Sequence, residues 1–297
     1  MEPAPPPANR FAFPAMLAGS ASLAFGPWLV RIADVAPMAS AFWRLSLAVV
    51  PLLLLARFVS GREGTPAFGG LNLGSLGLAA LAGVFFAIDL ALWHLGILRT
   101  TLANATLLTN AATFLLPLWG FVVLRQRPGR PARAALLAAA LGTALLLGRS
   151  ADLSPRNFTG DLLCLGAALF YTAYLLTIEK LRSRLAAMPL LALATAFGAV
   201  TMLPLALLEP GAFWPGNWTP ILVLAFGSQV FGQGLVVYAV GHLRPIVVGL
   251  ALLIQPAISA TVGALRFGEV PGVWELTGAG LVVAALLLVR LPDRAAP

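Results

Sequence analysis

The sequence predicts an all-α membrane protein, and three observations lead to that fold class. Of the 297 residues, 60% are hydrophobic and only 10% are charged, whereas a soluble globular protein carries about 25% charged residues. The apolar residues form runs close to the ~20 residues that a helix needs to cross a bilayer. The second half of the chain also resembles the first. We therefore expect ten transmembrane helices, arranged as two inverted five-helix repeats around a central cavity.

The apolar runs divide almost the whole chain into predicted spans. They cover residues 12–31, 37–58, 73–98, 100–124, 131–149, 158–179, 188–208, 219–241, 245–267 and 272–290. Residues 1–11 are rich in proline, and we expect them to form a disordered tail. The first run follows a start that is less basic than a cleaved signal peptide would have, so we expect it to be a retained helix. The connecting loops are too short for a soluble domain.

The internal repeat aligns LWHLGILRTTLANATLLTNAATFLLPLWGFVVLRQRP in the first half with VVYAVGHLRPIVVGLALLIQPAISATVGALRFGEVP in the second, at an offset near 145 residues. This alignment places Asn110 opposite Gln255. We therefore divide the chain into a first repeat at 1–150 and a second at 151–297. Five spans per repeat is an odd number, so the second copy must enter the membrane from the opposite side. Inverted repeats are typical of secondary transporters, in which the solute binds near mid-membrane. Gene duplication in a membrane protein that transports nothing is the alternative.

The basic residues orient the chain in the membrane. The formal net charge is +8, but most Arg and Lys residues lie in the short loops on one side of the predicted spans. The positive-inside rule places that side, and both termini, in the cytoplasm. No basic stripe is interleaved with exposed aromatic residues, so we expect no nucleic-acid partner. One cysteine, Cys164, and two distant histidines predict no metal site, and we expect no cofactor.

Several uncharged polar residues fall near the middle of predicted spans, where such side chains usually face a bundle interior or a wet cavity. We select as candidate solute-binding residues Asn110, Gln229, Gln233 and Gln255, together with Thr106 and Ser259. A polar residue in a spanning helix also often serves only to hold helices together. That alternative stays open for each residue, and above all for the hydroxyl-bearing ones.

The charged or ionisable residues inside the predicted spans include Arg44, Asp89 and His94. Asp89 is the carboxylate placed well inside a span, and it either couples transport to protons or is capped by a nearby helix terminus. We expect Arg44 to extend outward to the interface in a structural role, and His94 to be a surface histidine near the end of its span.

Aromatic and helix-breaking residues complete the candidate list. Phe86 and Trp93 flank Asp89 at helical spacing, and Tyr171 and Tyr174 lie deep in the sixth span, where they either stack on a solute or pack in the core. Four residues interrupt helical hydrogen bonding and are candidate hinges: Gly26, Pro27, Pro117 and Pro256. Prolines are also common in static spanning helices.

Short motifs give the chain a family resemblance. The ninth span contains a spaced glycine and proline, Gly249 and Pro256, and is followed by Gly268-Glu269. GDLLCLGAALFYTAYLL at 160–176 begins the second repeat and LTGAGLVVAALLLVR at 276–290 ends it. With its ten spans, the chain resembles the EamA type of the drug/metabolite transporter superfamily, and within it the YddG group of aromatic amino-acid exporters.

The resemblance implies a basket of helices around a central cavity, built mainly from the first, third, fourth, sixth, eighth and ninth spans, and export without covalent chemistry. The first repeat departs from the pattern, because Asn110-Ala111 replaces the Gln-Pro pair and Gln126 replaces Glu269. The halves therefore need not move alike, and no coupling role is carried onto both.

The resulting expectation is a secondary transporter that exports small metabolites, above all amino acids of an aromatic or broad range, by alternating access. A multidrug or other-metabolite exporter of the same fold is the alternative. An enzyme is disfavoured because no catalytic cluster shares one depth, and a channel because no ring of like residues is evident. We expect a small solute and membrane lipid as partners, a monomer or weak dimer, and a bacterial inner membrane location.

Overall fold

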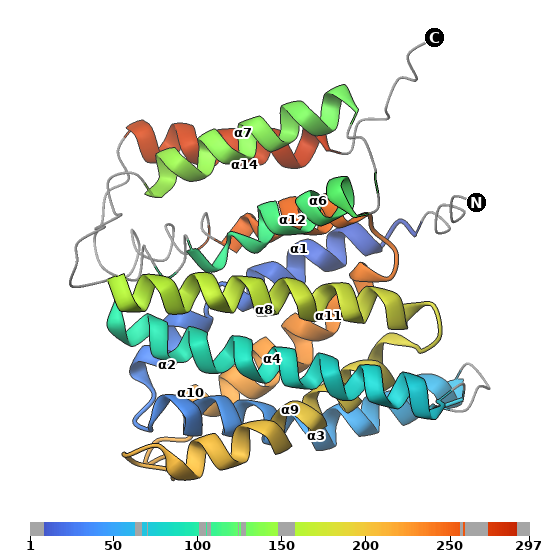
Figure 1. Ribbon diagram of the computed structural model, residues 1–297, viewed down its shortest axis with the longest axis vertical. Helices are drawn as coiled ribbons and strands as arrows, with labels where there is room; N and C mark the ends of the chain where they lie inside the picture. Colours follow the sequence, from blue (N-terminus) through green and yellow to red (C-terminus); the bar gives the residue numbers. More distant parts are fainter. Residues whose placement is uncertain are drawn as a thin grey trace.

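The computed structural model describes residues 9–62, 67–69, 71–100, 105, 108–123, 125, 129–147, 158–255, 258 and 273–289. Within these ranges the regular secondary structure is helical, and each of the ten predicted spans contains helix (Figure 1). Six helical segments are long and apolar enough to cross a membrane, and two more are shorter apolar helices. The all-α membrane fold expected from composition is thereby confirmed.

The helices of the first half are α1 (Ala12–Leu23), α2 (Gly26–Ile32), α3 (Pro37–Arg62), α4 (Leu73–Arg99), α6 (Ala112–Val122) and α7 (Arg130–Leu147). The second half contains α8 (Phe158–Arg182), α9 (Ala187–Leu208), α10 (Thr219–Val223), the π-helical segment η1 (Leu224–Gly232), α11 (Gln233–Val240), α12 (Pro245–Leu252) and α14 (Val273–Leu288). The repeat boundary predicted at 150/151 lies outside the described residues.

Local sequence explains where two of these helices begin. Asn72 caps α4, because its Oδ1 accepts a hydrogen bond from Ser75 N at 2.8 Å while Ser75 Oγ accepts one from Asn72 N at 2.8 Å. The first span is divided, and α2 begins at Gly26 with proline in its first turn, where a missing N–H costs no helical hydrogen bond. Residues 9–11 of the predicted disordered tail are described, and Asn9 Nδ2 donates to the Tyr238 hydroxyl at 2.6 Å.

Helix pairing follows the internal repeat. Three helices of the first half pack against their own counterparts in the second: α3 on α9, α6 on α12 and α7 on α14. The remaining helices pack across the two halves. Helix α4 of the first half packs on α8, the first helix of the second half. In the corresponding contact, η1 and α11, which are the counterparts of α4, pack on α1, which is the counterpart of α8. An exchange of this kind is what a two-fold relation between two copies of a five-helix unit requires.

The first helices of the two halves run in opposite directions. An Arg31 side-chain nitrogen at the end of α2 donates hydrogen bonds to the Ile97 and Thr100 carbonyls at the end of α4, so the first and third spans finish at the same level. The α8 helix starts at that level, since a Cβ on its Gly160 would lie 2.6 Å from Arg99 O. The second half therefore enters from the opposite side, as the odd number of spans predicts.

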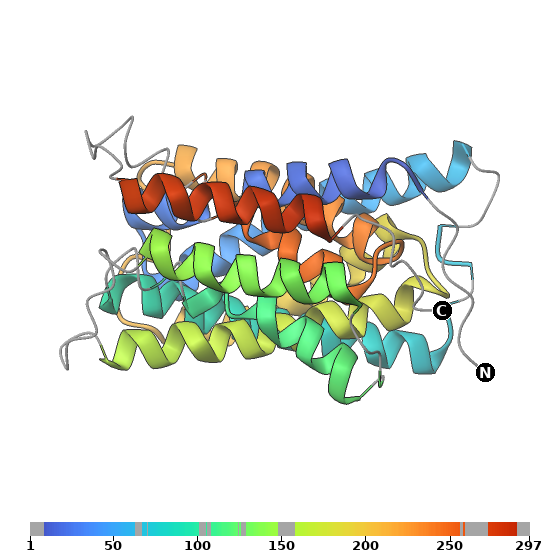
Figure 2. The same ribbon diagram turned by 90° about the horizontal axis from the view of Figure 1, so that it is seen from above.

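The pairs stack into layers across the molecule. In Figure 1 the α7–α14 pair lies at one end, α6 and α12 lie next to it, and α3, α9 and α10 lie at the other end. In the turned view of Figure 2 the helices again run roughly side by side, and α1 begins at the side where α14 ends. Both ends of the described chain thus lie on one side, as an even number of crossings requires.

Candidate functional site

Two buried charges of opposite sign lie inside the bundle, one on α3 and one on α4. The exposed fraction of Arg44 is 3% and that of Asp89 is 5%. Their charges act on one another, but within the described part of the chain they form no direct ion pair, and Arg44 Nε has no hydrogen-bond partner. Buried charges are costly unless they are paired and hydrogen-bonded. The Arg44 guanidinium and the Asp89 carboxylate therefore do not neutralise one another by direct contact.

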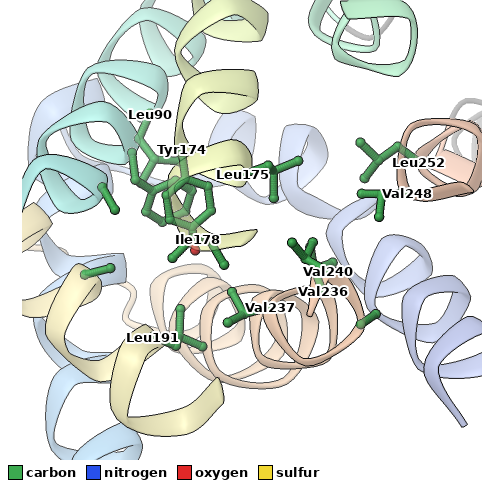
Figure 3. Packing of buried hydrophobic residues seen from close by; sticks show 14 of the residues in the cluster. Leu90, Tyr174, Leu175, Ile178, Leu191, Val236, Val237, Val240, Val248 and Leu252 are labelled. Carbon is green, nitrogen blue, oxygen red and sulfur yellow. The ribbon is translucent and has the colours of Figure 1, made fainter. Parts of the chain in front are cut away.

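An aromatic stack adjoins the two charges. The ring centroids of Phe86 and Tyr174 lie 4.6 Å apart, and those of Tyr171 and Tyr174 lie 5.9 Å apart, with interplanar angles of 24° and 26°. Figure 3 shows Tyr174 between Leu90 and Ile178, with its hydroxyl directed toward α11. Both tyrosines lie within electrostatic range of Arg44 and Asp89. The α8 helix thus brings a stacked aromatic surface to the charged pair.

Gln233, the first residue of α11, approaches this stack from the other side. Its amide faces the hydroxyls of Tyr171 and Tyr174. The geometry is too loose for a satisfied hydrogen bond, and Gln233 Nε2 and both hydroxyls have no partner among the described residues. We call the resulting group the polar cluster. Its members are Arg44, Phe86 and Asp89 from the first half and Tyr171, Tyr174 and Gln233 from the second.

Gln229 does not share the surroundings of Gln233. Its Nε2 donates a hydrogen bond to Thr195 Oγ1 on α9 at 3.0 Å, and both side chains are buried. Residues four apart lie on one face of an α-helix, but Gln229 lies in the π-helical segment η1, whose wider turn rotates the chain before Gln233. The two glutamines selected from one span thus have different neighbours: Thr195 of α9 lies beside Gln229, and the two tyrosines of α8 lie beside Gln233.

Asn110 and Gln255 lie near corresponding interruptions in the fourth spans of the two halves. Asn110 is buried and occupies a turn directly before α6. Gln255 is half-buried and follows a turn that comes after α12. A Cβ on Gly249 would lie 2.5 Å from Thr113 O, so α12 and α6 pack in near contact. Interrupted helices at matching positions of inverted repeats are a recurrent feature of transporter binding sites.

The remaining candidates are placed less centrally. The Trp93 ring packs against Gly26, at the break between α1 and α2. A Cβ added at Gly26 would lie 2.9 Å from that ring. Gly26 and Pro27 thus lie at a real interruption, whereas Pro117 lies inside α6. Thr106, Ser259 and Pro256 lie outside the described residues.

Two residues differ from their expected surroundings. Arg44 does not extend to the interface, and His94 is fully buried, with Nδ1 3.1 Å from the Pro37 carbonyl oxygen. Both corrections have one cause, because their depth depends on neighbouring helices rather than on distance from a span end. Arg44 is also the member of the polar cluster that sequence reasoning missed. The available signal was a second intramembrane charge within reach of Asp89.

One end of the bundle is closed by an apolar cluster and by polar contacts between the halves. The apolar cluster joins Leu29, Ile97, Cys164, Ile221 and Leu224, which come from α2, α4, α8, α10 and η1. Around it, Thr100 Oγ1 donates to Asp161 Oδ1, Met38 N donates to Glu209 Oε2 at 2.7 Å, and Trp43 Nε1 donates to Phe213 O at 2.8 Å. These contacts join the halves at the end where α4 finishes.

The inventory of side chains in the described residues fits binding better than catalysis. Among them, no group of three or more His, Cys, Asp or Glu residues is arranged to hold a metal ion. The polar cluster offers one cation, one anion, two hydroxyls, an amide and aromatic faces. Such a set can bind a small solute that is both charged and apolar.

Comparisons with known proteins agree with this description. Residues 158–291 match the EamA-like transporter family. An uncharacterized transporter from Archaeoglobus fulgidus is 25% identical over 263 residues, which span 87% of this chain and 89% of that protein. A solved structure, described only as the crystal structure of a protein, has a TM-score of 0.74 and 16% identity over 96% of each chain, a likeness that concerns the fold alone.

Proposed function

We propose that the chain is a transporter of the EamA-like family, which its residues 158–291 match, and that it exports small metabolites, above all amino acids of an aromatic or broad range. Its coarser function is that of a membrane transporter of the drug/metabolite type rather than an enzyme. The amino-acid solute rests on the chemistry of the polar cluster and on the resemblance to aromatic amino-acid exporters.

One observation supports the proposal most directly. Three residues of each half contribute to the polar cluster, and several of its buried polar atoms have no hydrogen-bond partner. Unsatisfied groups of this kind are rare in native structures and usually indicate a ligand, a water or a functional role. Their position between the halves is where an inverted-repeat transporter binds its solute.

Alternating access assigns roles to the other candidate residues. Asn110 and Gln255, with Thr106 and Ser259, would contact the solute from the interrupted fourth spans. Gln229, first selected as a solute-binding residue, would instead hold η1 against α9 through its bond to Thr195. Asp89 is the coupling candidate, because it is the fully buried carboxylate among the described residues. Movement would bend the chain at Gly26, Pro27, Pro117 and Pro256 and would open the closed end described above.

A multidrug exporter is the second candidate function. The stacked rings of Phe86, Tyr171 and Tyr174 would suit a lipophilic cation, with Asp89 as its counter-charge. Arg44 weighs against that reading, since a buried cation repels a cationic drug.

Location follows from the basic loops. We propose a bacterial inner membrane with both termini in the cytoplasm, and a monomer or weak dimer surrounded by lipid. The many exposed large apolar side chains on the outer helix faces suit contact with acyl chains.

Liposome transport tests the proposed function. We expect purified protein in liposomes to exchange labelled amino acids, and cells that overproduce it to resist toxic amino-acid analogues. If Asp89 couples transport to protons, an imposed pH gradient should drive accumulation, and accumulation that ignores the gradient would remove that role. Resistance to lipophilic cations without any amino-acid movement would favour the multidrug function instead.

A further inference from the structure

We propose that Arg44 and Asp89 together recognise the two charges of a zwitterionic solute, with the Arg44 guanidinium on the carboxylate and the Asp89 carboxylate on the ammonium. This inference rests on the proposed function and names the chemical class of its solute. The juxtaposition of two buried opposite charges beside an aromatic stack carries it.

The hydrogen-bonding state of the two charges is the first step. A buried structural pair is stabilised only by good contact geometry and by further hydrogen bonds. Arg44 and Asp89 are both at least 95% buried, and each lies within electrostatic range of the other. No direct ion pair joins them in the described part of the chain. A pair that served only to join α3 to α4 would be expected to close that contact. An open pair is suited to receive a ligand between its members.

The chemical class of the solute follows from charge balance. An α-amino acid carries an ammonium and a carboxylate on one carbon, so a single small solute offers each buried residue its opposite charge. A plain amine would satisfy Asp89 but leave the Arg44 guanidinium without an anion, and a plain carboxylate would do the reverse. Because an unpaired buried charge is costly, the site should select for solutes that carry both charges.

The aromatic stack adds a surface for the rest of the solute. Phe86 and Tyr174 are nearly fully buried, whereas Tyr171, the outer ring of the stack, is only half-buried. An apolar or aromatic side chain of the solute can pack on Tyr171. The unpartnered tyrosine hydroxyls and Gln233 Nε2 can complete the hydrogen bonds of the carboxylate. The site thus suits an amino acid with a large apolar side chain.

Unmodified protein gives the first test, by calorimetric titration with three matched solutes. L-phenylalanine carries both charges, phenethylamine lacks the carboxylate, and 3-phenylpropanoate lacks the ammonium. We expect phenylalanine to bind at least about 30-fold more tightly than either analogue, because losing one partner of a buried charge pair costs at least that factor. Equal binding of phenylalanine and either analogue would overturn the inference.

Variants then assign each charge to its residue. Arg44→Gln should lower the affinities for phenylalanine and 3-phenylpropanoate at least about 30-fold and leave that for phenethylamine unchanged. Asp89→Asn should lower the affinities for phenylalanine and phenethylamine by the same factor and leave that for 3-phenylpropanoate unchanged. Arg182→Gln is the matched control, because Arg182 bonds the Leu185 carbonyl at a helix end outside the cluster. A uniform loss for all three solutes in either variant would contradict the assignment.

Folding and function are separated by two further arms. The double variant Arg44→Gln/Asp89→Asn carries no unpaired charge; we expect it to elute as folded protein and to lose the preference for phenylalanine, and a retained preference would contradict the inference. Wild-type liposomes that move no amino acid would refute the proposed function. If wild-type protein in liposomes transports phenylalanine, and both analogues inhibit that transport as strongly as unlabelled phenylalanine does, only the two-charge site would be refuted.

Discussion

Buried polar residues in this bundle fall into two kinds that differ in hydrogen bonding. Gln229 and Thr195 bond to each other across η1 and α9, which is the contact expected of residues that hold helices together. Arg44, Tyr171 and Gln233 have buried polar atoms without a hydrogen-bond partner among the described residues, and such atoms are available to bond a solute. Gln229 Oε1 also has no partner among the described residues, so the two glutamines of one span differ in their amide nitrogens: Gln229 Nε2 is bonded to Thr195 and Gln233 Nε2 is not.

Thr195→Val should destabilise the protein without changing solute affinity. The substitution keeps the shape of the side chain but leaves Gln229 Nε2 without its acceptor. Interhelical hydrogen bonds average about 0.6 kcal/mol and reach about 1.7 kcal/mol, so we expect a loss of between about 0.6 and 2 kcal/mol. Thermal unfolding in detergent measures the loss, and titration with phenylalanine measures the affinity. A changed affinity with unchanged stability would place Thr195 and Gln229 in the binding site.

Gln233→Ala is the complementary change on the same span. Gln233 Nε2 has no hydrogen-bond partner to lose, so the expected loss of stability is the cost of the cavity that a smaller buried side chain leaves, about 1–2 kcal/mol. Phenylalanine should bind about fivefold to tenfold more weakly, as the loss of one hydrogen bond to a charged group predicts. Unfolding and titration of the purified variant test both values, and a large loss of stability with intact binding would make Gln233 a packing residue.

At the scale of helices, small residues let neighbouring backbones approach. A Cβ on Gly83 of α4 would lie 2.6 Å from both Ala194 O and Phe197 Cβ of α9, and a Cβ on Gly19 of α1 would lie 2.7 Å from Gly232 O in η1. Because lipid tails are as apolar as leucine, association of spanning helices depends on such close packing rather than on hydrophobic burial. The Gly83 contact holds α4, which carries Phe86 and Asp89 of the polar cluster, against α9.

Gly83→Ala tests this packing, and Gly77→Ala on the same helix is its control. A methyl group at Gly83 must displace backbone atoms of α9, so we expect a loss of about 1–3 kcal/mol. Nothing lies within 4 Å of a Cβ at Gly77, and the same substitution there should be neutral or slightly stabilising. Thermal unfolding of both variants gives the comparison, and equal effects would show that α4 and α9 are less tightly packed than described.

The sequence predicted the helices well because bilayer thickness sets the length of an apolar span. It predicted the site less completely, for reasons visible in single residues. The π-helical segment η1 before Gln233 packs against α1 and α3, and the apolar pattern of the span does not indicate it. The depth of Arg44 depends on Asp89 one helix away, whereas distance from a span end suggested an arginine that reaches the interface. Helical periodicity predicts which residues share one face of a helix, but the helices that pack against that face are determined by the tertiary fold.

At the scale of the whole molecule, the two halves exchange partners about a two-fold relation. The α4–α8 and α1–α11 packings correspond under this exchange, and the polar cluster draws equally on both halves. An arrangement of this kind can rock one half against the other and expose the same site to either side. The polar contacts around Glu209 and Asp161 join the halves at one end, so the structure has the form of a carrier closed at that end.

Cysteine labelling should fix which side each end faces. In a Cys164→Ala background, Ser183→Cys tests the turn between α8 and α9, and Ala212→Cys tests the loop after α9 near the closed end; both positions are exposed. Because Lys180, Arg182 and Arg184 flank Ser183, the positive-inside rule places that turn in the cytoplasm. A membrane-impermeant maleimide added to intact cells should therefore label Ala212→Cys and spare Ser183→Cys until the cells are permeabilised. The reversed pattern would place both termini outside and the closed end in the cytoplasm, whereas labelling of both positions in intact cells would contradict a span at α9.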